Sequence, residues 1–264
     1  MNIIPRKSLG QHWLNDEPTL QAIVDLAQLS ADDTVLEIGP GLGNLTEKII
    51  AQAKKTVAVE LDEELVKKLQ EKFKTPKIEI ISQNILRFNL LDLPEGYKIV
   101  ANIPYYLTSH LIRMLCESNR HFSRAVILVQ KEIAQRITAK PGEMSILGLT
   151  TQYYCGVSTD RVVPASYFSP SPKVDSQILI LDFKNKPLYS DIHTGLYFRI
   201  IKAGFSQKRK TLQNSLSGGL KLEKSVVTNK LIEANISPSF RAQNLSLDDW
   251  HRLYLKLTPL LDNT

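Results

Sequence analysis

Apolar runs alternate with helix-like patterns along residues 34–138, and this alternation constrains the fold more than any other feature of the chain. Five runs have the composition of buried strands, TVLEIG (34–39), TVAVEL (56–61), KIEIIS (77–82), KIVAN (98–102) and AVILVQ (125–130). Helical patterns separate or follow them, at 45–53, 62–73, 108–117 and 131–138. Strands and helices that alternate at this spacing predict a parallel sheet with helices on both faces.

Two further strand candidates follow, LTTQYYCGV (149–157) and SQILILDF (176–183). A Pro-rich stretch joins them without an obvious helix, so we expect an antiparallel pair at one edge of the sheet. The predicted fold class is therefore α/β, with a Rossmann-like sheet of seven mostly parallel strands.

A domain boundary is predicted at FKNKPLYS (183–190), which ends the last strand and contains a proline. We expect a first domain over 1–186, with a basic N-terminal segment (1–16) that closes over its site. A small, all-helical domain is expected over 187–264. Its first helical pattern is expected to break near residues 206–208, where a lysine interrupts the apolar spacing.

The net positive charge of the chain comes entirely from its C-terminal third. Residues 1–185 carry 21 Lys and Arg against 21 Asp and Glu, whereas residues 186–264 carry 12 against 6. A neutral body with a basic end indicates a polyanionic partner, nucleic acid first, although a solvated basic surface would carry the same charge. We predict RNA phosphate contacts at the following basic residues: Arg6, Lys7, Lys208, Arg209 and Lys210.

Composition and motifs exclude several other classes of protein. The 264 residues are 43% hydrophobic and 23% charged, without an apolar run of the ~18 residues that a membrane span needs and without a secretory apolar core. Cys116 and Cys155 lie outside any Cys-x-x-Cys pattern, so we expect reduced thiols and no metal site. A cytoplasmic monomer is the expectation.

A glycine-rich loop follows the first strand. The sequence GPGLGN places Gly39, Gly41 and Gly43 between a strand and a helix, where a missing Cβ lets the backbone approach a ligand. Glu60 ends the next strand 21 residues after Gly39, where a carboxylate can accept hydrogen bonds from ribose hydroxyls. This pattern predicts a nucleoside-containing cofactor, either NAD(H) or S-adenosylmethionine.

Two features favour S-adenosylmethionine over a dinucleotide. The glycines are spaced G-x-G-x-G, whereas a dinucleotide site usually has G-x-G-x-x-G to seat a pyrophosphate. Asn84 ends the third strand, where a polar residue can recognise adenine, although alone it would be expected to cap a turn.

The fourth strand ends in NIPYY (102–106), which predicts methylation of an adenine amine. The lone pair of that amine is delocalised into the ring, so acceptors for its hydrogens favour its attack on a methyl group. Asn102 can supply its side-chain oxygen and Ile103 its carbonyl, since Pro104 restricts Ile103 to an extended conformation. Tyr105 offers a ring that stacks on a base held out of its own stack, and Phe168 is a candidate for the opposite ring.

The chain resembles the ribosomal RNA adenine dimethyltransferases, in particular those of the bacterial small subunit. The resemblance covers KSLGQHWLND, VLEIGPGLGNLT, VELDEEL, VANIPYYLTSHLI, VQKEIAQR, FSPSPKVDSQI and FSQKRKTLQNSL. It implies a class I methyltransferase fold with a helical C-terminal domain, and dimethylation of two adjacent adenosines in a hairpin loop near the 3′ end of small-subunit rRNA, on a precursor of the 30S subunit. It also implies cofactor contacts at His12, Leu14, Gly39, Glu60, Asn84 and Asn102.

Two of these positions depart from the family pattern, because His12 stands where Asn is common and Asn84 where Asp is common. A neutral imidazole or an amide still accepts one hydrogen bond, but the Asn at position 84 cannot provide the charge of a carboxylate. Two alternatives remain open. One is the sister group that methylates large-subunit (23S) rRNA and confers macrolide resistance, and the other is a non-catalytic RNA-binding assembly factor.

Overall fold

The computed structural model of the chain describes residues 5–6, 9–186 and 188–261, and these residues form two compact units. The first unit extends to Gln135 and adds Cys155–Lys184, and the second comprises Arg136–Tyr154 and the chain from Asn185 onward. The domain boundary was expected between residues 186 and 187, and residue 187 lies outside the described ranges. The sequence did not indicate that 136–154 joins the second unit.

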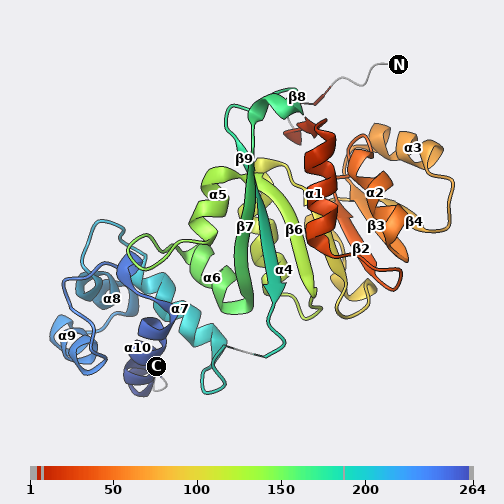
Figure 1. The fold of residues 1–264 in the computed structure, drawn as a ribbon. Coiled ribbons are helices and arrows are strands. Elements are labelled where there is room, and N and C mark those ends of the chain that lie inside the picture. The colour runs from red at the N-terminus through yellow and green to blue at the C-terminus, as the bar shows by residue number, and fades with distance from the viewer. Residues whose placement is uncertain (1–4, 7–8, 187, 262–264) are drawn as a thin grey trace. The chain divides into compact units, whose positions relative to one another are not determined.

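The first unit is built on one seven-stranded sheet (Figure 1). In spatial order its strands are β4 (Ile78–Ser82), β3 (Lys55–Glu60), β2 (Thr34–Ile38), β5 (Lys98–Asn102), β6 (Arg124–Gln130), β9 (Ser176–Phe183) and β7 (Cys155–Val163). Neighbouring strands are parallel except that β9 runs antiparallel to both β6 and β7. The predicted sheet of seven mostly parallel strands is confirmed, including its antiparallel edge.

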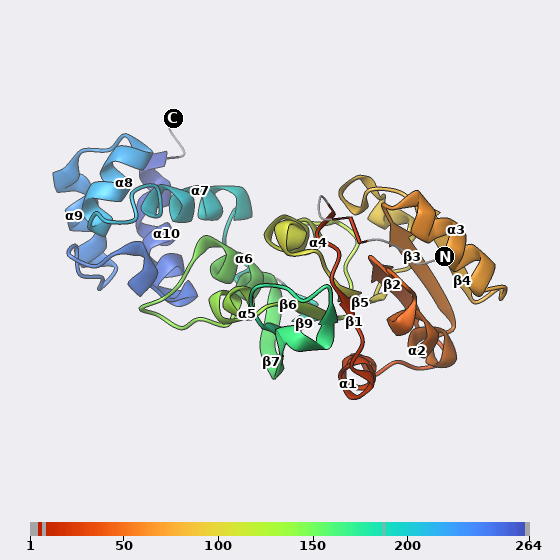
Figure 2. The same ribbon diagram turned by 90° about the horizontal axis from the view of Figure 1, so that it is seen from above.

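Helices cover both faces of this sheet. Figure 2 shows α1 (Glu17–Ala27) and α4 (Thr108–Cys116) on opposite faces. Helix α1 is capped by Asp16, whose carboxylate accepts a hydrogen bond from the Thr19 backbone amide, and the helix buries Ile23 and Val24 in the core. The other helices that follow strands are α2 (Asn44–Gln52), α3 (Glu63–Lys72) and α5 (Lys131–Ile137), close to the predicted positions.

One expected strand is wrong over two thirds of its length. Residues 149–154 belong to helix α6 (Ile146–Tyr154), and β7 begins only at Cys155. Leu149 and Tyr153, four positions apart, are both buried on one side of that helix, and Thr151 donates from its hydroxyl to the Leu147 carbonyl oxygen at 2.9 Å. Threonine and tyrosine have strand-like composition, but the burial of Leu149 and Tyr153 in the core of the second unit stabilises the helix.

A separate two-stranded sheet orders the N-terminal segment. β1 (Trp13–Leu14) pairs antiparallel with β8 (Phe168–Ser169), with Trp13 opposite Ser169 and Leu14 opposite Phe168. The N-terminal segment therefore lies beside the loop that precedes β9, although about 155 residues separate the two in sequence.

The second unit is helical within its described residues, as predicted for the C-terminal third. Besides α6 it contains α7 (Thr194–Gly204), α8 (Leu212–Leu220), α9 (Lys224–Glu233) and α10 (Leu247–Leu261). Trp250 of α10 is buried in the core that these helices share, and a Cβ on Gly204 of α7 would lie 2.4 Å from its indole ring. The break expected near residues 206–208 is confirmed, since α7 ends at Gly204 and α8 begins at Leu212. None of the helices within the described ranges has the length and apolar character that a bilayer crossing requires.

Candidate active site

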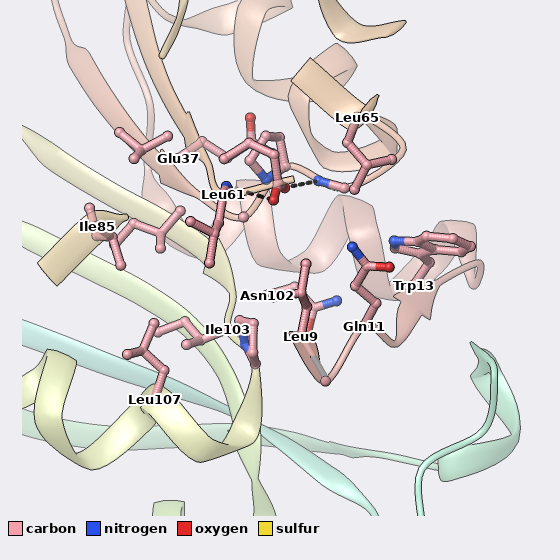
Figure 3. Close-up of a pocket in the computed structure, with 18 of the residues that line it drawn as sticks. Leu9, Gln11, Trp13, Glu37, Leu61, Leu65, Ile85, Asn102, Ile103 and Leu107 are labelled. Carbon is pink, nitrogen blue, oxygen red and sulfur yellow. Dashed lines mark hydrogen bonds between the residues drawn. The ribbon is translucent and has the colours of Figure 1, made fainter. Parts of the chain in front are cut away.

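A pocket lies at the carboxyl ends of strands β2, β3, β4 and β5 in the first unit. It is lined by residues 9–14, 37–42, 44–45, 59–61, 83–86 and 102–107, together with Leu20 and Ile23 of α1 and Leu65 of α3. Figure 3 shows Leu9, Gln11 and Trp13 of the N-terminal segment on one side of Asn102, with Ile103 and Leu107 on the other. In an open sheet of this kind, ligands bind outside the carboxyl ends of the strands.

The glycines of the loop after β2 serve different purposes. All three have positive φ, at +69° for Gly39, +59° for Gly41 and +81° for Gly43. A Cβ on Gly41 would lie 2.9 Å from the Trp13 ring, and a Cβ on Gly43 would lie 2.7 Å from the Phe73 ring. Gly43 therefore permits helix packing. A Cβ on Gly39 would meet only two atoms within 4 Å, at 3.8 and 3.9 Å, so the backbone of Gly39 is open to the pocket.

Glu60 was predicted to lie beside the glycine-rich loop, and its carboxylate binds the backbone of that loop. It ends β3 and is buried, and its Oε1 accepts from the amides of Leu61 (2.8 Å) and Asp62 (2.9 Å). Its Oε2 accepts a longer bond, 3.3 Å, from the Gly41 amide. Burial raises the pKa of the Glu60 carboxyl, although these three amides favour its ionised form. A ligand hydroxyl can still donate to Oε2.

A second buried carboxyl, Glu37, was missed by the sequence analysis. It lies in β2 and lines the pocket with a side chain that is 1% exposed, and neither of its oxygens has a hydrogen-bond partner among the described residues. Burial raises its pKa to about 8 and the nearby Glu60 carboxyl acts in the same direction. The Thr46 hydroxyl acts in the opposite direction, although its geometry falls short of a full hydrogen bond. The only signal in the sequence was one acidic residue inside the apolar run TVLEI.

Asn84 lines the pocket and also caps a turn. Its Oδ1 accepts from the Leu86 amide at 3.0 Å and starts the 3-10 turn Ile85–Arg87. The turn-capping function that a lone Asn would be expected to have is thus present in the structure. Its contact with adenine remains a prediction.

Side-chain contacts hold the N-terminal segment over the first helix after β3. Gln11 donates from Nε2 to Asp62 Oδ2 at 3.0 Å, and Arg6 Nε lies 3.4 Å from the same oxygen. Arg6, predicted to contact RNA, is therefore paired with a carboxylate here, and Lys7 lies outside the described residues. Leu14 is buried and lines the pocket. The sequence analysis did not identify Gln11 or Asp62.

The side chain of Asn102 is oriented by the N-terminal segment. Its Nδ2 donates to the His12 carbonyl oxygen at 3.1 Å, and no hydrogen bond to its Oδ1 is formed within the described residues. Ile103 is 1% exposed, and Pro104 precedes the 3-10 turn Tyr105–Leu107. Because the amide nitrogen is engaged by a carbonyl, the acceptor oxygen is the atom left for a ligand.

The Tyr105 ring is fixed at its hydroxyl and covered on its face. The hydroxyl lies 2.8 Å from Ser176 Oγ, and burial raises its pKa. The His12 ring stacks against the Tyr105 ring, with centroids 5.7 Å apart and planes inclined by 21°. Nothing in the sequence indicated that Ser176 or His12 would contact this ring.

Phe168 does not line the pocket. It is 5% exposed, packs in a core cluster with Leu14, Leu20 and Leu45, and is absent from the pocket lining. The ring opposite Tyr105 in this structure is that of His12. Stacking of a base on Phe168 remains a prediction, one that this arrangement does not support.

The remaining predicted RNA contacts lie in the second unit. Lys208, Arg209 and Lys210 are exposed in the turn between α7 and α8. No carboxylate of the described residues forms an ion pair with them, so their charges are free to interact with an anion.

Comparison with known proteins adds to this geometry. Residues 4–258 match the family model described as ribosomal RNA adenine dimethylase. Two curated relatives are both called ribosomal RNA small subunit methyltransferase A. The one from Dehalococcoides mccartyi is 40% identical over 95% of this chain and 88% of its own. The one from Clostridium botulinum is 38% identical over 94% of this chain and 92% of its own.

Two solved structures are similar over nearly the whole chain. A dimethyladenosine transferase from Plasmodium falciparum has a TM-score of 0.81 at 27% identity, covering 94% of this chain and 98% of its own. The 23S rRNA methyltransferase ErmE has a TM-score of 0.75 at 28% identity, covering 93% of this chain and 99% of its own.

Proposed function

The chain belongs to the ribosomal RNA adenine dimethylase family, and on that premise we propose that it transfers methyl groups to the exocyclic N6 amines of two adjacent adenosines in the 3′-terminal hairpin loop of small-subunit (16S) rRNA, giving N6-dimethyladenosines. The small subunit is favoured because the curated relatives carry its name. The observation that supports the chemistry best is the Asn102 side chain, whose acceptor oxygen has no hydrogen bond within the described part of the chain and lines the pocket.

S-adenosylmethionine is the proposed cofactor, and the residues of the pocket fit it. The Gly39 backbone is open to the pocket and, among the described residues, Glu60 Oε2 has one long hydrogen bond and both Glu37 oxygens are buried without partners. We assign Glu60 to the ribose hydroxyls, Asn84 to the adenine, and His12, Leu14, Gly39, Gly41 and Asn102 to the remaining cofactor contacts. The cofactor supplies a methyl group that is already activated by a positively charged sulfur.

Asn102 and Ile103 are proposed to act on the target amine. Asn102 Oδ1 accepts one N–H of that amine, and the Ile103 carbonyl, which forms no hydrogen bond within the described residues, accepts the other. In the first transfer, accepting both hydrogens would direct the nitrogen lone pair at the methyl carbon and stabilise the charge that develops on nitrogen. The N–C bond would form as the bond from that methyl to sulfur breaks, and one of the two protons would then be lost to solvent. Pro104 precedes the 3-10 turn and restricts Ile103, which lines the pocket, to an extended conformation.

Tyr105 is proposed to hold the target base. Its ring position is fixed by the hydroxyl contact with the buried Ser176. Stacking on such a ring returns roughly 1–3 kcal/mol per base, which offsets the cost of removing the adenine from its own stack. Since a fixed ring loses little freedom on binding, most of that free energy is retained.

The RNA partner is proposed to be the precursor of the 30S subunit, contacted by Arg6, Lys7, Lys208, Arg209 and Lys210. Lys208, Arg209 and Lys210 are exposed, which suits phosphate contacts. Arg6 would exchange its pair with Asp62 for a phosphate. Because the proposed substrate is a ribosome precursor, we place the enzyme in the cytoplasm, and we expect it to act as a monomer.

A methylation experiment separates this function from its alternatives. The protein is incubated with labelled S-adenosylmethionine and with either small or large ribosomal subunits that lack the modification, and the label is mapped. Label on two adjacent adenosines of 16S rRNA is expected. Label on 23S rRNA would favour the large-subunit alternative, which similarity to ErmE keeps open. Tight RNA binding without label would indicate an assembly factor.

A further inference from the structure

The buried carboxylate of Asp62 is a feature that the proposed chemistry does not use. It lies just after β3, and its side chain is 3% exposed. Its Oδ1 accepts from the Glu64 amide at 3.1 Å and so caps α3, whereas its Oδ2 accepts from Gln11 Nε2 at 3.0 Å. A buried charge is stable only where hydrogen-bond partners satisfy it, and the N-terminal segment supplies one of these partners.

The side-chain amide of Gln11 is held at both of its polar atoms. Its Oε1 accepts from the Arg6 backbone amide at 2.7 Å, while its Nε2 donates to Asp62. Because one atom accepts and the other donates, only one orientation of this amide satisfies both partners. Within the described residues, the bond to Asp62 is the one hydrogen bond that joins residues 9–11 to the chain beyond the N-terminal segment.

The later part of the same segment is attached independently of that bond. Residues 13–14 pair with β8, and Asn44 Nδ2 donates to the Leu14 carbonyl oxygen at 3.1 Å. Residues 9–14, which include Gln11 in Figure 3, form one wall of the pocket. This wall is therefore anchored by backbone and side-chain contacts at its later end, and by one side-chain hydrogen bond at its earlier end.

The proposed function requires the cofactor pocket to open repeatedly. Each methyl transfer consumes one S-adenosylmethionine, so dimethylation requires the spent cofactor to be exchanged between transfers. We propose that the hydrogen bond between Gln11 and Asp62 is a latch for this exchange, which holds residues 9–11 against the pocket when formed and releases them when broken. Asp62 is then a positioning residue that acts on the cofactor through Gln11. This inference rests on the proposed function and adds to it the control of cofactor exchange.

An isosteric exchange of the two partners tests the latch. Asp62→Asn keeps an oxygen for the Glu64 amide, and Asn caps helices as well as Asp does, but its nitrogen then faces Gln11 Nε2, another donor. Gln11→Glu places a second carboxylate against Asp62, and the exposed Arg6 offsets little of that repulsion. When both changes are combined, the new Asn nitrogen can donate to the new Glu oxygen with side chains of unchanged length.

Two measurements follow the latch without catalysis. The first is the dissociation rate of labelled S-adenosylmethionine after a chase with excess unlabelled cofactor. Each single variant should raise this rate by about 10- to 150-fold, the equivalent of one hydrogen bond to a charged group, and the double variant should restore it. The second is acrylamide quenching of Trp13 in the ligand-free protein, since Trp250, the other tryptophan of the chain, is fully buried. Quenching should increase in both single variants and fall back in the double variant.

Gln70→Glu adds the same charge at an exposed position of α3 and should match the wild type in both measurements. Wild-type dissociation in Asp62→Asn would overturn the latch. Defects that persist in the double variant would also overturn it, because they would come from the altered residues and not from their pairing. A wild type that binds and releases S-adenosylmethionine but leaves 16S rRNA unlabelled would instead contradict the proposed function, while restoration in the double variant would still support the latch.

Discussion

Asn102 donates a hydrogen bond from its side-chain nitrogen to the backbone carbonyl of His12, 90 residues earlier in the chain, at 3.1 Å. This hydrogen bond to the N-terminal segment therefore sets the orientation of the Asn102 side-chain amide. Asn102→Ala should lower the single-turnover methylation rate on the order of 10²–10³-fold, as for loss of one preorganised hydrogen-bonding group. RNA affinity should remain, because distant phosphate contacts supply it.

The measurement is a single-turnover rate at saturating cofactor and RNA, with RNA affinity determined separately. Tyr105→Phe is the comparison variant, since it keeps the ring and loses only the contact with Ser176, and it should be mild. A wild-type rate in Asn102→Ala would refute the assignment of its oxygen to the amine.

Glu60→Ala should weaken S-adenosylmethionine binding by ~1.5–3 kcal/mol, the value of hydrogen bonds to a charged group. The change also removes the acceptor for the amides of Gly41, Leu61 and Asp62, so the glycine loop loses a support. Titration calorimetry provides the measurement. Glu71→Ala, an exposed change on α3, is the matched control and should bind like the wild type. Equal affinity of the two variants for S-adenosylmethionine would show that Glu60 does not bind the cofactor.

Because of Glu37, we expect the cofactor-free protein to lose stability as the pH rises. Its pKa is raised from 4.5 to about 8 in the folded state, so the folded protein holds a proton that the unfolded chain has released. The contribution of the Glu37 carboxyl to the free energy of unfolding has its full value below about pH 4.5. It falls by up to about 1.4 kcal/mol per pH unit until the folded carboxyl ionises near pH 8.

Unfolding midpoints of the cofactor-free protein, measured between about pH 6 and 9, on either side of that pKa, test this expectation. Glu37→Gln cannot ionise and should show a flatter profile and a higher midpoint than the wild type near pH 8. Glu71→Gln, which changes an exposed carboxyl, is the control and should follow the wild type. Parallel profiles for all three proteins would mean that the Glu37 carboxyl is already ionised at neutral pH.

The basic turn between α7 and α8 should supply salt-dependent RNA affinity. Removing one phosphate contact should reduce the slope of log affinity against log salt by about 1, so replacing Lys208, Arg209 and Lys210 by Ala should reduce it by up to about 3. Calorimetric affinity for S-adenosylmethionine should stay unchanged. A triple Ala variant of Lys54, Lys67 and Lys74 removes equal charge elsewhere. The same slope in both variants would show that the turn has no special part in binding.

The sheet was predictable because its strands are apolar runs bounded by turns, and the glycine loop and Asn102–Tyr105 could be placed from the strands that precede them. Other features depend on tertiary contacts that leave no pattern in the sequence. Residues 149–154 are helical because Leu149 and Tyr153 pack in the hydrophobic core of the second unit. Strands of two residues, β1 and β8, have no periodicity, so the pairing that buries Phe168 could not be predicted.

The pairing of β1 with β8 also has a consequence for biosynthesis. A ribosome delivers the chain from its N-terminus, so Trp13 and Leu14 emerge long before Phe168 and Ser169, their partners. The glycine loop and NIPYY can take shape earlier on strands that are already synthesised, but one wall of the pocket has no partner strand until nearly two thirds of the protein has been translated. A nascent chain released before residue 169 could pair five of the seven strands of its sheet and would still lack a closed binding site.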